Sequence, residues 1–220
     1  SDRFTRVGDD AQFFRPQGAE ARRFIDLLKA RGTVVDPTLV AFESMYTQQQ
    51  REPNPSFSMI AEHLPAHWQR ELRAADFDLE GPRFVAYQTA FERMLQMTAE
   101  LHRSGVPLIT GTDSPHGFSL HRELELYVRA GISPSAALRA STLEAARALG
   151  EQDRRGSIER GRIADLVLVA GDPTTQISDI RRTALVIQGT TAWQPARIYR
   201  ALGIRPFADA LAVDGSVSDD

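Results

Sequence analysis

The feature that most constrains the fold of this chain is a short apolar strand followed at once by a single carboxylate. Residues 105–110 read Gly-Val-Pro-Leu-Ile-Thr, and the predicted strand ends at Gly111, just before Asp113. In an α/β barrel the loops that follow the strands build the active site, so an acidic residue here is placed to do chemistry. The same residue type also caps turns by accepting backbone N–H groups. Asp113 is therefore a candidate catalytic residue, with turn capping as the alternative.

Several motifs that follow Asp113 favour the catalytic interpretation. They read Leu-His-Arg-Glu-Leu-Glu-Leu at 120–126, Ala-Gly-Ile-Ser-Pro at 130–134, Ala-Leu-Arg-Ala-Ser-Thr at 137–142, Ala-Ala-Arg-Ala-Leu-Gly at 145–150 and Gly-Ser-Ile-Glu-Arg-Gly-Arg-Ile-Ala-Asp-Leu-Val at 156–167. In this order the motifs resemble the C-terminal part of the amidohydrolase superfamily, and most closely its imidazolonepropionase-like and Xaa-Pro dipeptidase-like members. The resemblance extends over about residues 19–206.

The resemblance implies a barrel whose strand ends carry metal ligands. These are a His-x-His pair from the first strand, often a carboxylated Lys from the fourth, His residues from the fifth and sixth, and an Asp from the eighth. Asp113 matches the last of these, and the preceding segment 33–40 would be the seventh strand. The implied cofactor is a divalent metal, zinc before others, as one or two ions. Such a metal lowers the pKa of bound water toward about 7, and a carboxylate can take the water's proton and pass it to the leaving nitrogen. Asp113 is thus assigned both a catalytic and a metal-binding role.

Two histidines follow Asp113 closely. His116 and His121 would project from the loop and helix after the eighth strand, over the mouth of the metal site. Neither occupies a metal position of the family pattern, so we expect both to contact the substrate, with helix capping or a surface position as the alternative. His63 and His67 have the spacing of a helical zinc pair, but Pro65 interrupts the turn and no Glu follows His63, so the zincin motif is not met.

The remaining sequence pattern predicts helices alternating with strands. The helices are expected over 19–31, 82–104, 120–130 and 196–202, with a further helix starting at Ser133 and Pro134, and the strands over 33–40, 106–110, 163–169 and 184–188. Residues 1–18 show no period and are expected to be loop. Residues 41–80, with a short helix near 66–73, form a long insertion on the catalytic face. This insertion is a candidate lid, and a surface excursion is the alternative.

These segments predict an α/β fold, and the resemblance implies that it contains the last two strand–helix units of a TIM-type (β/α)8 barrel and then strands of a small β-sandwich. The expected divisions are 1–150 for the barrel part, 151–206 for the sandwich strands and final helix, and 207–220 for a polar tail. A complete barrel takes about 250 residues. We therefore expect the sequence to be the C-terminal fragment of a longer enzyme.

Composition limits the expected partners. The 220 residues carry a formal net charge of −3, without a run of like charges or an apolar stretch of membrane-spanning length, so neither nucleic acid nor a membrane is expected. The absence of Cys excludes thiolate ligands and Cys nucleophiles. We expect a soluble protein of undetermined compartment, a small-molecule substrate, and a homo-oligomer when full-length.

The function predicted from the sequence is hydrolysis of a C–N bond, in an amide, peptide-like or cyclic amide substrate, by metal-activated water. The alternative is a non-catalytic partial barrel that acts as an interaction or scaffold domain, because open sheet edges and exposed apolar faces attract partners.

Overall fold

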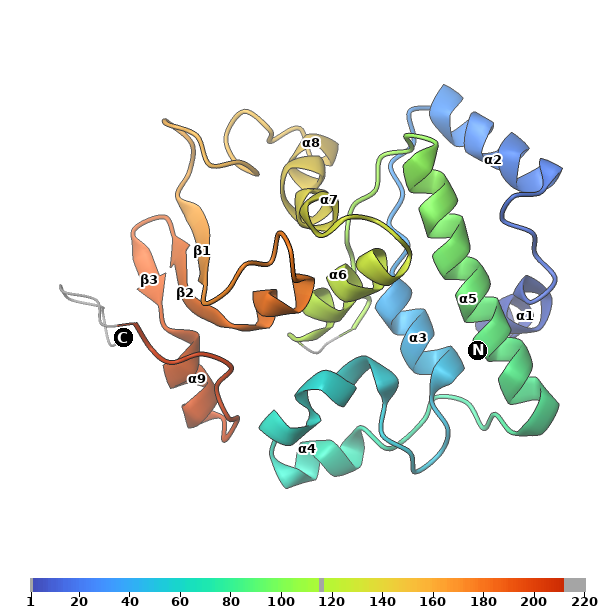
Figure 1. Ribbon diagram of the computed structural model, residues 1–220, viewed down its shortest axis with the longest axis horizontal. Helices are drawn as coiled ribbons and strands as arrows, with labels where there is room; N and C mark the ends of the chain where they lie inside the picture. Colours follow the sequence, from blue (N-terminus) through green and yellow to red (C-terminus); the bar gives the residue numbers. More distant parts are fainter. Residues whose placement is uncertain (1, 115–116, 212–220) are drawn as a thin grey trace.

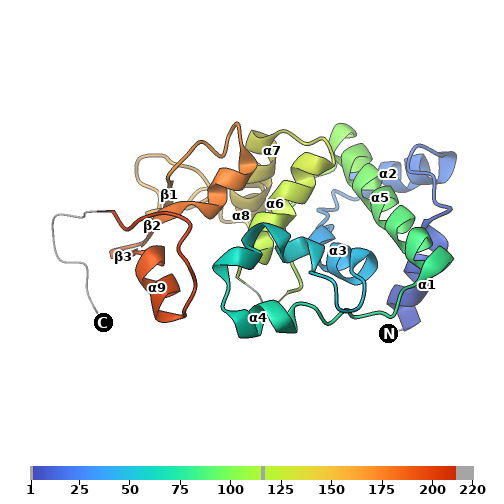
Figure 2. The same cartoon turned by 60° about the horizontal axis from the view of Figure 1, so that its bottom comes forward.

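The structure is a computed structural model that describes residues 2–114 and 117–211 (Figure 1). Its elements in chain order are α1 (Asp2–Ala11), α2 (Ala19–Ala30), α3 (Leu39–Thr47), the 3-10 helix η1 (Pro55–His63), α4 (Ala66–Glu71), α5 (Gly81–Arg103), α6 (Ser119–Arg129), α7 (Pro134–Arg139), the π-helix η2 (Ala140–Glu144), α8 (Ala145–Ala148), β1 (Asp165–Val169), the 3-10 helix η3 (Ile177–Arg181), β2 (Thr183–Gln188), β3 (Thr191–Trp193) and α9 (Pro195–Ala201). Figures 1 and 2 show α1, α2 and α5 at one end of the long axis and the small sheet with α9 at the other. The elements α3, α4 and α6 lie between them.

The longest helix, α5, organises one end of the molecule. The helix predicted over 82–104 is confirmed, and side chains at helical spacing are buried along it: Tyr87, Phe91, Leu95, Thr98 and Leu101. The helices predicted around 19–31 and 120–130 are also confirmed, as α2 and α6. In each case an apolar face repeats at the helical period and a glycine follows the last turn.

Helix α1 contradicts the loop predicted for residues 1–18. It packs on α5, where the Tyr87 hydroxyl donates a 3.1 Å hydrogen bond to the Thr5 carbonyl. A Cβ at Gly8 would lie 2.5 Å from the ring of Tyr87, so only a glycine lets the two helices approach this closely. The prediction was wrong because it overlooked the apolar residues Phe4, Val7 and Ala11, which recur at the helical period.

The segments predicted as barrel strands lie side by side and run parallel. Val35 pairs with Leu108 in a parallel bridge. The Val35 N–H donates to the Pro107 carbonyl, and the Ile109 N–H donates to the Val35 carbonyl, both at 3.0 Å. The C-terminal ends of the two segments therefore meet at one edge, where the following loops begin.

Neither segment forms the regular strand predicted over 33–40 or 106–110, and in the described chain each is extended with one isolated bridge residue, Val35 and Leu108. The first segment also ends early, because helix α3 already starts at Leu39. Pro37 has no N–H to donate to a ladder. Thr38 has φ 51°, in the left-handed region, so the chain turns there from extended to helical conformation.

The insertion over 41–80 is more ordered than predicted. It contains most of α3, the 3-10 helix η1 and α4, and α4 confirms the short helix expected near 66–73. An apolar cluster joins it to the loop before α6 and to the C-terminal segment, through Phe57, Ile60, Leu64, Phe118 and Ile204. The insertion is thus packed against the loop that follows the second parallel segment.

The C-terminal part contains a small antiparallel sheet in the order β1-β2-β3. Strands β1 and β2 confirm the strands predicted over 163–169 and 184–188, and β3 was not predicted. The start of α7 is also confirmed, because the Ser133 hydroxyl accepts the Ala136 N–H at 3.3 Å. Helix α9 confirms the final helix expected over 196–202.

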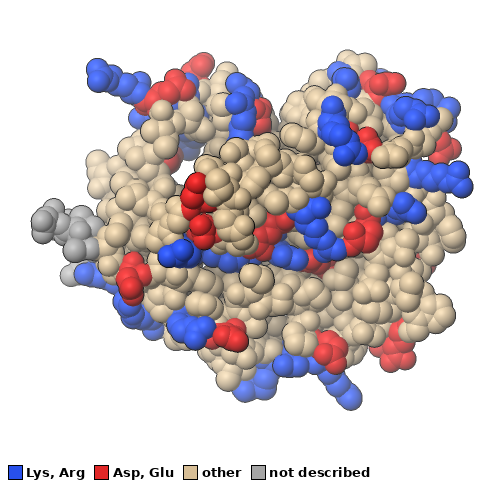
Figure 3. Space-filling view, in the orientation of Figure 1, with Lys and Arg blue, Asp and Glu red and all other residues tan. Residues whose placement is uncertain are grey.

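The described fold is mixed α/β with one small antiparallel sheet. Figure 3 shows basic and acidic side chains interspersed over the visible face. Within residues 2–114 and 117–211 no helix has the length and apolar character needed to cross a membrane.

Candidate active site

Asp113 lies in the loop that leaves the second parallel segment. Its side chain is exposed, and its φ of 42° places it in the left-handed region, which Asp adopts more readily than most residues. Among the described residues no hydrogen-bond donor reaches its carboxylate. The Asp113 carboxylate is therefore open to a ligand at the end of the second parallel segment.

A second carboxylate, Asp36, fixes the geometry of this edge and was missed in the sequence. Its Oδ1 accepts hydrogen bonds from the Thr38 N–H at 3.1 Å, the Thr38 hydroxyl at 3.0 Å and the Gly111 N–H at 3.0 Å. Asp36 therefore ties the end of the first parallel segment to the end of the second, two residues before Asp113. The signal was available, because Asp36 follows a β-branched run just as Asp113 follows an apolar strand.

The close approach of the two loops depends on Gly111. A Cβ at this position would lie 1.9 Å from Oδ2 of Asp36 and 2.7 Å from its Cγ. Any larger residue would force the Asp36 carboxylate away from the amide that it accepts.

Glu123 of α6 holds the start of α3 against the same edge. The side chain is fully buried, and its two oxygens accept the Leu39 N–H at 2.9 Å and the Val40 N–H at 2.7 Å. Burial raises the pKa of Glu123 to about 8, and the two N–H donors act in the opposite direction. A carboxylate from α6 thus caps the N-terminus of a helix that starts 84 positions earlier in the chain.

A buried charge network connects this edge to the C-terminal part. Arg122 makes a bidentate pair with Glu43, with both N···O distances 2.8 Å, and reaches Glu125 at 3.0 Å. Arg181 of η3 makes a second bidentate pair with Glu125, at 2.8 and 3.0 Å. Burial acts to raise the pKa of the Glu125 carboxyl, but the bonds from Arg181 and Arg122 outweigh it, and this pKa lies below its usual range. The pairs fix α3, α6 and η3 relative to one another.

His121 lies beside this network. Its Nδ1 is buried and has no hydrogen-bond partner in the described part of the chain. Burial, and then the positive charge of Arg181, lower the pKa of His121 to about 4, against the opposing effect of Glu125. The ring is therefore neutral at physiological pH.

Three further histidines, His63, His67 and His116, lie apart from His121 in the sequence. His116 lies outside the described residues. His63 donates from Nδ1 to the Arg205 carbonyl at 2.6 Å, and the His67 ring packs edge-on against Trp68.

The described residues fit one position of a metal centre but not a whole centre. Zinc sites use three or four protein ligands, and within 2–114 and 117–211 no group of three or more His, Cys, Asp or Glu side chains could hold an ion. Asp113 can supply one ligand. Asp36 is less suited to this role, because its Oδ1 already accepts three hydrogen bonds.

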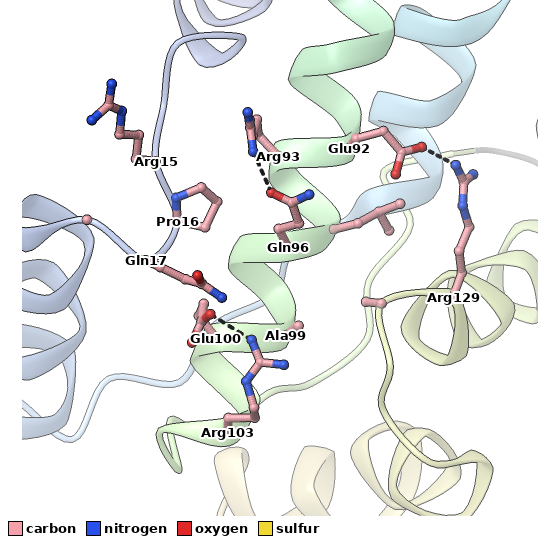
Figure 4. Close-up of a pocket in the computed structure, with 13 residues that line it drawn as sticks. Arg15, Pro16, Gln17, Glu92, Arg93, Gln96, Ala99, Glu100, Arg103 and Arg129 are labelled. Carbon is pink, nitrogen blue, oxygen red and sulfur yellow. Dashed lines mark hydrogen bonds and ion pairs between the residues drawn. The ribbon is translucent and has the colours of Figure 1, made fainter.

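A cavity of about 760 Å³ lies elsewhere, along the outside of α5 (Figure 4). The charged residues that line it are Arg15, Glu92, Arg93, Glu100, Arg103 and Arg129. Two of its arginines are paired, Arg129 with Glu92 and Arg103 with Glu100. Neither Asp113 nor His121 lines this cavity, so it is not part of the candidate site.

Comparison with known proteins identifies the family. The profile of the Amidohydrolase family matches residues 8–192, so this chain belongs to the amidohydrolase family. Imidazolonepropionase of Geobacillus thermodenitrificans is 32% identical over 190 residues, which cover 77% of this chain and 42% of that protein. The resemblance found in the sequence is confirmed.

Solved structures show the same likeness of fold. A Xaa-Pro dipeptidase with methionine bound in its active site superposes with a TM-score of 0.55 at 24% identity, over 80% of this chain and 37% of that one. The A. niger ochratoxinase gives a TM-score of 0.53 at 20% identity, over 77% and 34%. This chain spans less than half the length of each of these relatives.

Proposed function

We propose that this chain carries the proton-transferring carboxylate of a metal-dependent amidohydrolase that cleaves the C–N bond of an amide, peptide-like or cyclic amide substrate. The observation that carries the proposal is the position of Asp113. It is an exposed carboxylate at the end of the second of two parallel segments, in a chain of the amidohydrolase family. The relatives named imidazolonepropionase and Xaa-Pro dipeptidase support a hydrolytic function for it.

In this proposal the segments around Val35 and Leu108 are the seventh and eighth strands of a TIM-type barrel. Residues 1–150 form the barrel part and residues 151–206 contribute strands to a small β-sandwich. The parallel pairing of Val35 with Leu108 supports the assignment of these two segments as neighbouring barrel strands. The resemblance places the other metal ligands on earlier strands, so activity requires a polypeptide that supplies them.

The chemistry divides between the metal and this chain. A divalent ion, with zinc first among the candidates, supplies the Lewis acidity that makes water easier to deprotonate at neutral pH. Asp113 accepts the proton of the attacking water as a general base and returns it to the leaving nitrogen as a general acid. Asp36 is a positioning residue, because its bond to the Gly111 N–H holds the start of the Asp113 loop.

His116 and His121 remain proposed substrate contacts. The support for His121 is its position near the start of α6, eight residues after Asp113. The support for His116 is its position in the sequence, three residues after Asp113.

The experiment that tests the proposal is a hydrolysis assay on a longer polypeptide that contains these residues together with the rest of the barrel. Suitable substrates are a Xaa-Pro dipeptide, an N-acyl amino acid and a cyclic amide. Turnover that is lost after chelation and restored by zinc or another divalent metal supports the proposal. Turnover that survives complete metal removal contradicts the proposal. A failure to hydrolyse any of these amides also contradicts it.

A further inference from the structure

We propose that an apolar pocket between the insertion and α9 binds an apolar group of the substrate, an aromatic or branched aliphatic side chain or acyl group. This inference rests on the proposed function. The pocket encloses about 510 Å³, within the range of small-molecule sites. Its main walls are Phe57, Leu64, Trp68, Phe118, Tyr199 and Ile204.

The position of the pocket connects it to the candidate catalytic residue. One wall comes from the insertion after the first parallel segment, and another, Gly117 and Phe118, from the loop after the second. Active sites in barrels form from these same loops. Phe118 is five residues from Asp113, and five residues of chain span at most about 18 Å. The pocket wall at Phe118 therefore lies within about 18 Å of Asp113 along the chain.

The pocket walls are held together before any ligand binds. The Arg205 N–H donates to the His63 carbonyl at 2.8 Å, and His63 Nδ1 returns a bond to the Arg205 carbonyl. The His63 ring stacks on Phe207 with a centroid separation of 3.9 Å. Figures 1 and 2 show the C-terminal segment with α9 beside η1 and α4. A preformed pocket binds without the cost of ordering its walls.

The lining also selects the kind of group that binds. Aromatic and aliphatic side chains predominate, and Glu71 is the one charged residue among the described residues that line the pocket. A carboxylate on the ligand would be repelled by Glu71, so the charged end of a substrate must face away from it. The pocket therefore suits the neutral, apolar arm of a substrate.

The test uses the 220-residue chain without metal and reads binding from Trp68. The chain has two tryptophans, and Trp193→Phe leaves Trp68, in the pocket wall, as the sole tryptophan reporter. The probes are N-acetyl-L-phenylalanine and its matched control N-acetylglycine. We expect a saturable change in Trp68 emission with the phenylalanine derivative, and binding of the glycine derivative that is at least about tenfold weaker. Acrylamide quenching of Trp68 should fall when the phenylalanine derivative binds.

Two variants at one position locate the binding. A Cβ at Gly117 meets nothing within 4 Å, so Gly117→Ala should fold and bind normally. Gly117→Leu extends a side chain from the pocket wall and should weaken binding of the phenylalanine derivative at least about tenfold. Thermal melts of both variants report whether the fold is kept. The quenching measurement is made on the chain with Gly117 unchanged, so it does not depend on the folding of either Gly117 variant.

Several results would overturn the inference. These are no saturable response, equal responses to the two probes, unchanged binding in a folded Gly117→Leu variant, or a pocket shielded by self-association seen in light scattering. Because the assay needs neither metal nor turnover, its failure is separable from failure of the proposed function. Probe binding without amide hydrolysis by the completed barrel would instead count against the hydrolase assignment.

Discussion

Replacing Gly111 by alanine should break the contact that holds the two loop ends together. The new Cβ would lie 1.9 Å from Asp36 Oδ2, so the carboxylate must move and lose its bond to the Gly111 N–H. The two bonds from Thr38 to the same oxygen weaken with it. Backbone strain does not enter, because the φ of Gly111 is not positive.

The expected cost follows from these bonds. Hydrogen bonds to charged groups contribute about 1.5–3 kcal/mol when buried, and Asp36 is exposed, so each is worth less here. We therefore expect Gly111→Ala to lower the free energy of unfolding by about 1–3 kcal/mol. For a chain of this size that corresponds to a decrease in Tm of roughly 2–4 °C per kcal/mol.

A double-mutant cycle isolates the contact. Asp36→Ala removes the three atoms nearest to the Gly111→Ala methyl, which all belong to the Asp36 carboxyl group. The second substitution should then cost nothing, or stabilise by about 0.4–1 kcal/mol because the unfolded chain loses freedom. Urea unfolding of the four proteins gives the coupling energy. Equal costs of Gly111→Ala in both backgrounds would refute the role assigned to Asp36.

Three further outcomes are expected. The folded pKa of His121, about 4, lies below its unfolded value of 6.5, so the unfolded state binds more protons in that window and stability falls as pH decreases from 6.5 to 4. Relative to His121→Asn, the wild type should lose up to about 3 kcal/mol across this range in urea titrations, and parallel pH profiles would contradict the burial of a neutral ring. Gly8→Ala should lower the free energy of unfolding by about 1–3 kcal/mol in circular dichroism melts, since its Cβ would lie 2.5 Å from the Tyr87 ring. Unchanged stability would contradict the packing of α1 on α5. Calorimetry of the 220-residue chain with zinc should show no stoichiometric submicromolar binding, because one carboxylate cannot replace three or four ligands, and such binding, lost in Asp113→Asn, would show a complete site.

The parts of the fold that the sequence predicts are those encoded locally. Helices α2, α5 and α6 repeat apolar residues at the helical period, and β1 and β2 are short β-branched runs bounded by turns. The N-cap of α7 is readable because Ser133 precedes a proline at the first helical position.

The parts that the sequence does not predict depend on distant contacts. Helix α3 begins at Leu39 because Glu123, far along the chain, accepts its first amides, and a β-branched segment therefore ends sooner than its composition indicates. Helix α1 is stabilised by the approach of Gly8 to Tyr87 of α5, a contact that joins distant parts of the chain.

The candidate site divides in the same way. Asp113 stands out in the sequence because the apolar run 106–110 precedes it, and Asp36 carries a similar signal that Pro37 directly after it obscured. The bidentate pairs of Arg122 and Arg181 with buried glutamates depend on how α3, α6 and η3 pack, so they could not be read from spacing.

The most direct measurement of the central claim is the turnover of Asp113→Asn in a polypeptide with the complete barrel, with bound metal determined on the same sample. The amide keeps the shape of the side chain but loses the charge and the capacity to accept a proton. We expect kcat to fall at least about 10²–10⁴-fold, the usual loss when a general acid–base is removed. Asp26→Asn, an exposed position on α2, should leave kcat unchanged. An Asp113→Asn enzyme that retains its metal and turns over within a few-fold of the wild type would show that Asp113 is not the catalytic carboxylate.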